Sequence, residues 1–171
     1  ELVEFNGKLF YVAETFEEGL ELWMSDGTED GTTIVKDIRV GDRSSSPSEL
    51  TVFNDRLFFV ANSLDAGEEL WVTDGTENGT FLFKDINMSR SLFDNPNSSS
   101  PKELTVVDNK LFFTADTARF GRQIWVSDGK PEGTLRVTER INSPTSLSPR
   151  YLTAFNGELF FSGNRSSTGR E

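Results

Sequence analysis

The residues best suited to chemistry in this sequence are acidic, and they gather in a turn that occurs three times. The copies offer, in order, Asp26, Glu29 and Asp30; Asp74, Glu77 and Asn78; and Asp128 with Pro131 and Glu132. Oxygen-rich loops suit Ca²⁺, which takes about six to eight oxygen ligands, so Asp26, Asp30 and Asp74 are candidate calcium ligands. Only the first Asp recurs, whereas a repeated metal site would keep its ligands. The pattern therefore favours a structural turn that holds neither metal nor another cofactor.

Other catalytic chemistry finds little support. The chain contains no Cys and no His, which excludes disulfides, thiolate metal sites and the commonest catalytic base. There is no nucleophile elbow, phosphate-binding loop or dinucleotide fingerprint. With 28 Asp and Glu residues, no single pair of carboxylates stands out for glycoside hydrolysis. We predict no enzyme in this segment, and keep open an enzyme whose site lies on further repeats.

The charge balance limits the partners. The formal net charge is −11, from 17 basic and 28 acidic residues. This charge argues against nucleic acid and against anionic membrane surfaces, both of which attract basic patches. No apolar run exceeds the length of Leu57–Ala61, so we expect no membrane insertion.

The acidic turns belong to a longer repeat that organises the whole chain. The pattern Gly-x-x-Leu-Trp-x-x-Asp-Gly-x-x-x-Gly-Thr occupies residues 19–32 and 67–80, and returns with changes at 121–134. A period near 50 residues is typical of repeat architectures. The units are 1–48, 49–102, 103–150 and a partial unit 151–171, and we expect them to form one part of a larger repeat domain.

The sequence of each unit predicts four short strands. In the second unit these are residues 50–53, 57–61, 69–73 and about 81–85. Asn-Gly pairs between apolar runs predict tight hairpins, as at Asn6-Gly7. The continuous run Leu57–Ala61 predicts a strand buried on both faces. The expected fold is all-β, with tandem four-stranded antiparallel blades forming an arc of a β-propeller. An open stack of sheets and a row of small sandwiches remain alternatives.

The recurring glycines and tryptophans have structural interpretations. Gly27, Gly75 and Gly129 fit turn positions with positive φ. Trp23, Trp71 and Trp125 hold one position in a strand, which favours packing between blades over stacking on sugars. Asp37 and Asp85 recur after the fourth strand, where a blade-to-blade hydrogen bond is the expected role. We expect Phe5, Phe10 and Trp23 to line an open apolar face of the first unit.

The chain resembles the ELWxxDGT repeat proteins. Two copies match that motif in full, as Glu21-Leu22-Trp23 with Asp26-Gly27-Thr28 and Glu69-Leu70-Trp71 with Asp74-Gly75-Thr76. The third departs from it, reading Gln123-Ile124-Trp125 with Asp128-Gly129-Lys130, and the fourth retains only Glu171. The resemblance implies a propeller-like scaffold that is extracellular or on the cell surface, and it implies no known activity or functional residue.

Surface features complete the expectations. Asn78, Asn87, Asn97 and Asn164 lie in glycosylation sequons. The connector 87–100 is longer than its counterpart in the first unit, and Leu92-Phe93 within it suggests a partner contact, although a tolerated insertion explains it equally well. The favoured function is a structural or adhesive scaffold whose partners are further blades or other subunits. A carbohydrate-binding module with glycan ligands is the alternative.

Overall fold

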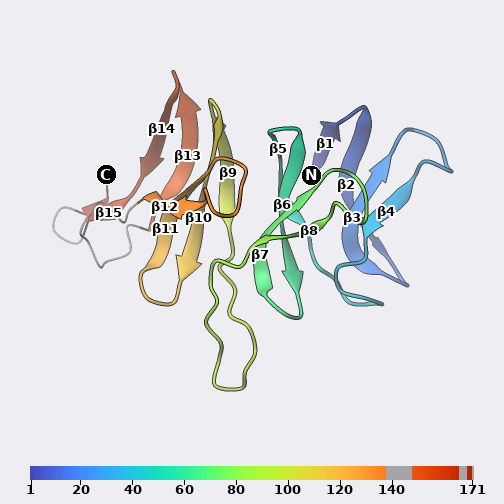
Figure 1. The fold of residues 1–171 in the computed structure, drawn as a ribbon, viewed down its shortest axis with the longest axis horizontal. Helices are drawn as coiled ribbons and strands as arrows, with labels where there is room; N and C mark the ends of the chain where they lie inside the picture. Colours follow the sequence, from blue (N-terminus) through green and yellow to red (C-terminus); the bar gives the residue numbers. More distant parts are fainter. Residues whose placement is uncertain (138–147, 166–168, 171) are drawn as a thin grey trace.

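The computed structural model describes residues 1–137, 148–165 and 169–170, and it is all-β (Figure 1). Its strands form consecutive antiparallel sheets that we call blades 1 to 4. Blade 1 contains β1 (Leu2–Phe5), β2 (Lys8–Thr15), β3 (Gly19–Ser25) and β4 (Thr33–Lys36). Blade 2 contains β5 (Ser48–Phe53), β6 (Arg56–Ser63), β7 (Gly67–Thr73) and β8 (Phe81–Lys84). Blade 3 contains β9 (Lys102–Val107), β10 (Lys110–Thr117), β11 (Gly121–Ser127) and β12 (Leu135–Arg136).

Blade 4 is a two-stranded hairpin of β13 (Arg150–Phe155) and β14 (Glu158–Ser162). A second short hairpin pairs β15 (Asn164–Arg165) with β16 (Gly169–Arg170). Within each four-stranded blade the strands pair in sequence order, and the first strands of successive blades lie against one another. The prediction of tandem four-stranded antiparallel blades is confirmed, and among the described residues the blades form an arc and not a closed ring.

Local sequence explains the hairpins. Asn6 and Gly7 have φ values of 51° and 73°, and Asn156 and Gly157 have 50° and 75°. Positive φ at both central residues is the geometry of a type I′ turn, whose twist matches that of the flanking strands. These turns fix the register, which places alternate side chains of each strand on opposite blade faces.

The blades pack face to face through two different surfaces. The Phe face of one blade meets what we call the Trp face of the next. The first joint brings Phe5, Phe10, Leu22 and Val35 of blade 1 against Leu50, Leu57, Phe59, Ala61 and Trp71 of blade 2. The second brings Phe53, Phe58, Leu70 and Phe83 of blade 2 against Leu111, Phe113, Ala115 and Trp125 of blade 3. Both faces of β6 are therefore buried, as its continuous apolar sequence predicts.

One expectation about the open face of blade 1 was wrong. Phe5 and Phe10 lie on the Phe face, are 3% and 1% exposed, and pack against blade 2. The cross-strand partner of Trp23 is Tyr11, whereas Phe10 pairs with Met24, so Phe10 and Trp23 point to opposite faces. The exposed surface of blade 1 is its Trp face, formed by Leu2, Leu9, Tyr11, Ala13 and Trp23.

Polar groups also join successive blades. Glu1, Glu49 and Glu103 each accept a hydrogen bond from a backbone N–H of the next blade, at Leu50 (3.0 Å), Leu104 (3.2 Å) and Leu152 (2.9 Å). Lys36 and Lys84 donate to the carbonyl groups of Thr80 (2.8 Å) and Pro131 (2.7 Å) in the following blade. The role expected of Asp37 is thus carried by its neighbour Lys36, because the Asp37 carboxylate accepts from Gly41 N–H within its own connector (3.0 Å).

Candidate functional site

The polar side chains of the Asp-Gly-Thr turn form hydrogen bonds within the turn itself. Asp74 Oδ1 accepts from Thr76 N–H at 2.9 Å and from the Thr76 hydroxyl at 2.7 Å. Thr76 Oγ1 in turn accepts from Gly79 N–H at 3.0 Å, and Thr80 Oγ1 donates to the Thr76 carbonyl at 2.6 Å. The corresponding bonds recur in blade 1 around Asp26. The turn is therefore a closed hydrogen-bonded unit, as expected for a structural motif.

The glycines of this turn have two separate roles. Gly27, Gly75 and Gly129 have φ of 93°, 94° and 92°, as expected for turn glycines. The second glycine leaves room for the aspartate, because a Cβ on Gly79 would lie 2.0 Å from Asp74 Oδ1. The same overlap occurs at Gly31 and Gly133, at 1.9 and 2.1 Å.

Replacing Gly79 by alanine is expected to destabilise the protein by about 1–3 kcal/mol, because the added methyl must expel the Asp74 carboxylate from its hydrogen bonds. Urea unfolding of G79A, D74A and the double variant measures this. Once Asp74 is already alanine, the second substitution should have little further effect. Equal losses from G79A in both backgrounds would contradict the steric explanation.

Two of the three candidate calcium ligands already have hydrogen-bond partners. The Thr28 and Thr76 hydroxyl groups, followed by the backbone N–H groups of the same residues, lower the pKa of Asp26 and of Asp74. Asp30 is exposed on the same turn as Asp26. Within the described residues, no group of three or more Asp, Glu, His or Cys side chains is arranged to hold a metal ion.

We expect EDTA to leave the melting temperature unchanged within error, and added Ca²⁺ to have no effect, because threonine and backbone donors already satisfy the turn aspartates. Differential scanning calorimetry of dialysed protein with and without each reagent is the measurement. A calcium-dependent rise in melting temperature that the D26N and D74N variants abolish would restore the metal hypothesis.

The three tryptophans occupy equivalent positions in unequal surroundings. Trp71 is 7% exposed and lies 6.5 Å, between ring centroids, from Phe59 at the joint of blades 1 and 2. Trp125 packs against the joint of blades 2 and 3 and stacks on Phe113, also at 6.5 Å. Trp23 lies on the Trp face of blade 1, which no other described blade covers. The interpretation as blade-packing residues fits Trp71 and Trp125.

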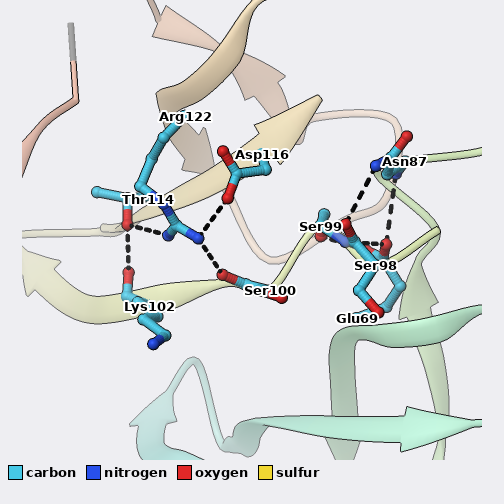
Figure 2. A network of polar contacts seen from close by, with 9 residues as sticks. All are labelled: Glu69, Asn87, Ser98, Ser99, Ser100, Lys102, Thr114, Asp116 and Arg122. Carbon is cyan, nitrogen blue, oxygen red and sulfur yellow. Dashed lines mark hydrogen bonds and ion pairs between the residues drawn. The ribbon is translucent and has the colours of Figure 1, made fainter. Parts of the chain in front are cut away.

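The most buried acids among the described residues, Glu21 and Glu69, were not singled out from the sequence. Glu69 is fully buried and closes both ends of connector 87–100 (Figure 2). Its Oε1 accepts from the N–H groups of Ser99 (2.8 Å) and Asn87 (3.4 Å), and its Oε2 from Ile86 N–H (3.0 Å) and the Ser99 hydroxyl. Burial raises the pKa of Glu69 to about 7, against the effect of these hydrogen bonds. A nearby Asp85 carboxylate adds to the rise.

Glu21 repeats this arrangement in blade 1. Its carboxylate accepts from Ser45 N–H at 2.9 Å, from Arg39 N–H at 3.4 Å, and from the Ser45 hydroxyl. Burial again raises the pKa, and the hydrogen bonds oppose it. Each of these two acids anchors the connector that follows its own blade, because its carboxylate binds two separate segments of connector backbone.

A sequence signal for this pair was available. Glu21 and Glu69 occur with Ser45 and Ser99, whereas the third unit has Gln123 and, at the serine position, Leu147. Acid and serine are thus kept or lost together, as expected for contacting residues. Gln123 instead donates to the Phe120 carbonyl at 2.7 Å.

Arg122 is the centre of a polar cluster next to the Glu69 site (Figure 2). It donates to the Asp116 carboxylate (2.6 Å), the Thr114 hydroxyl (2.9 Å) and the Ser100 carbonyl (3.0 Å). The same arginine lines a shallow cleft between blades 3 and 4, together with Lys102, Glu103, Thr114, Pro149, Arg150 and Tyr151. Arg122 holds β10, β11 and the end of the connector together, which is a structural role.

Connector 87–100 folds back on itself as a finger. Ser91 N–H donates to the Asn95 carbonyl (2.8 Å), Asn97 N–H donates to the Ser89 carbonyl (3.1 Å), and Arg90 pairs with Asp94. Leu92 and Phe93 lie at its tip, and their exposed fractions are 101% and 87%. The structure thus displays the predicted apolar pair on a hydrogen-bonded loop, and a partner contact there stays a prediction.

The sequons differ in their surroundings. Asn78 is exposed in the turn of blade 2. The side-chain amides of Asn87 and Asn97 donate to the Ser98 carbonyl (3.1 Å) and the Ser89 hydroxyl (2.9 Å), both within the finger. The side chain of Asn164 lies outside the described residues. Asn78 is therefore the most accessible of the acceptors whose side chains are described.

Comparisons with known proteins give little further information. No protein-family model and no curated protein matches the sequence. Among solved structures, the endo-arabinase from Bacteroides thetaiotaomicron VPI-5482 is similar over 99% of this chain and 70% of its own length. The sequence identity is 17% and the TM-score is 0.41. A similarity at this level carries no argument about activity or substrate.

Proposed function

We propose that this chain is a non-catalytic repeat scaffold of the ELWxxDGT type, displayed outside the cell or on its surface, which mediates protein–protein assembly. The observation that carries the proposal is the use made of the recurring residues. The motif acids Asp26, Asp74, Glu21 and Glu69 bind backbone and hydroxyl groups of the chain itself. The recurring apolar residues pack blade on blade. The recurring residues therefore maintain the fold, and a partner would bind to the outer surface of the blades.

A carbohydrate-binding module is the second candidate, favoured by one observation. Tyr11 and Trp23 pair across β2 and β3 on the Trp face of blade 1, and both are partly exposed. Neighbouring aromatic rings on a surface can stack on sugars. Stacking would use a face that blades 2 and 3 use for packing, which makes this the weaker candidate.

A glycan array separates the two candidates. The wild-type chain and its W23A variant are labelled and applied at equal concentration to the same array. The scaffold proposal predicts no glycan bound above background by either protein. A glycan bound by the wild type and lost in W23A, with the fold of the variant verified by circular dichroism, would replace the scaffold proposal with the carbohydrate-binding one.

A further inference from the structure

The Trp face of blade 1 repeats a surface that is covered in blade 2. Leu2 and Leu9 are 70% and 42% exposed, whereas their counterparts Leu50 and Leu57 are 9% and 0% exposed. The difference arises because the Phe face of blade 1 covers blade 2. The same side chains at the same register therefore form a joint in one blade and an exposed apolar surface in the other.

The surroundings of the turn glycines show that the Trp face of blade 1 lacks the phenylalanine contact found in the two joints. A Cβ on Gly75 would lie 3.3 Å from Phe10 Cζ, and one on Gly129 would lie 3.5 Å from Phe53 Cε1. In each joint a phenylalanine of the preceding blade thus reaches the turn glycine of the next, from β2 in the first joint and from the end of β5 in the second. The equivalent position at Gly27 has no neighbouring atom within 4 Å. Blade 1 therefore has the same turn glycine, and the space beside it, where a phenylalanine would pack, is unoccupied among the described residues.

The hairpin of blade 4 presents the matching element. Phe155 and Phe160 are 60% and 50% exposed, and their ring centroids lie 6.0 Å apart. The corresponding pair Phe53–Phe58, which is buried in the joint of blades 2 and 3, has a separation of 5.9 Å. The hairpin thus repeats the inner half of a Phe face without a blade against it among the described residues.

We propose that two copies of this chain associate head to tail, with Phe155 and Phe160 of one copy seated on the Trp face of blade 1 of the other. The inference rests on the proposed scaffold function and names its partner as a second copy. It extends an interface that the chain already forms twice. A two-stranded hairpin suffices for a joint, because the opposite face of blade 4 buries Leu152 against blade 3.

The polar residues of blade 4 agree with the head-to-tail direction of this contact, but one hydrogen bond of the other joints is missing from it. Asn54 donates to the Asp128 carbonyl of the next blade at 3.1 Å, and Asn156 has the same turn position and nearly the same φ, 50° against 49°. The glutamate that accepts a backbone N–H of the next blade is replaced in blade 4 by Tyr151, whose φ of 60° matches Glu49. The new joint therefore lacks one charge-assisted hydrogen bond.

Complementation between two blocked variants tests the proposal. L9D blocks the head, F160D blocks the tail, and both substitutions fall on exposed side chains. Sedimentation equilibrium should show that the wild type self-associates with increasing concentration, because a head-to-tail contact leaves a free head and tail for further copies. Each variant alone should remain a monomer, and an equal mixture should give a complex of two chains and nothing larger. The matched control L92D, on the finger tip, should associate like the wild type.

A gain-of-function variant tests the register of the joint. Y151E supplies the missing acceptor for Leu2 N–H of the second copy, and should tighten association about tenfold, whereas Y151A should not tighten it. A monomeric wild type at all concentrations would overturn the proposal, as would a mixture of L9D and F160D that stays monomeric. Loss of association in L92D would move the contact to the finger. These outcomes leave the scaffold function standing, whereas glycan binding through Trp23 would remove it.

Discussion

Replacing Trp71 by alanine is expected to lower the free energy of unfolding by about 3–5 kcal/mol, because the substitution empties a large volume at a joint between two blades. Trp71 is 7% exposed and belongs to the same cluster as Phe10, Leu22 and Phe59. The remaining side chains are fixed by two sheets and cannot close fully around the cavity. Urea unfolding followed by circular dichroism measures the loss.

The repeat supplies a matched control for this prediction. W23A removes the same side chain from the same strand position in blade 1, where the Trp face is not covered by another described blade. We expect a loss well below that of W71A, measured in monomeric protein at low concentration. Equal losses in the two variants would contradict the assignment of Trp71 to a blade joint.

Replacing Glu69 by alanine is expected to destabilise the protein by about 3 kcal/mol or more, because several buried donors lose their acceptor together. The N–H groups of Ile86 and Ser99 both lie within 3.0 Å of this carboxylate, and the Ser99 hydroxyl donates to it as well. Hydrogen exchange should report the cause, with faster exchange at residues 86–100. The control variant E68A, on the adjacent and less buried glutamate, should exchange like the wild type.

The pH dependence of Glu69 provides an independent test. Its pKa is raised to about 7, so the folded protein retains a proton between about pH 4.5 and 7 that the unfolded chain has released. Stability therefore falls as the pH rises through this window and levels off above it. Relative to E69Q, which cannot titrate, the wild type should lose stability from about pH 4.5 to about pH 8. A gain over the same range would show that the hydrogen bonds, and not burial, dominate.

Much of the fold could be predicted because the repeat samples the same local rules several times. Asn-Gly turns, a continuous apolar second strand and the Asp-Gly turn each recur, and each restricts the backbone on local grounds. A unit with a neighbour on each side buries its recurring apolar positions against those neighbours, which is why the position of Trp71 in the repeat predicted packing between blades. The structure confirms the strands and their antiparallel order.

The errors concerned side-chain direction and polar contacts over long distances. Phe10 was assigned to the face of Trp23, although across β2 and β3 it is Tyr11 that pairs with Trp23 and Phe10 pairs with Met24. The register of the strands is required to decide which face a side chain occupies. Glu69 was treated as part of a motif, since its partner Ser99 is 30 residues away and hydrogen bonds at this separation leave no local pattern. Comparing the acid and serine positions between units would have identified the pair.

Packing between blades is the role that this structure assigns to Trp71. Fluorescence quenching by acrylamide in the single-tryptophan variant W23F/W125F measures the accessibility of Trp71 directly. A Trp71 side chain buried between blades 1 and 2 should give blue-shifted emission and slow quenching in native protein, with the rate rising steeply only when urea unfolds the chain. Native quenching as fast as that of the unfolded chain would place Trp71 on the surface and contradict its assignment to a blade joint.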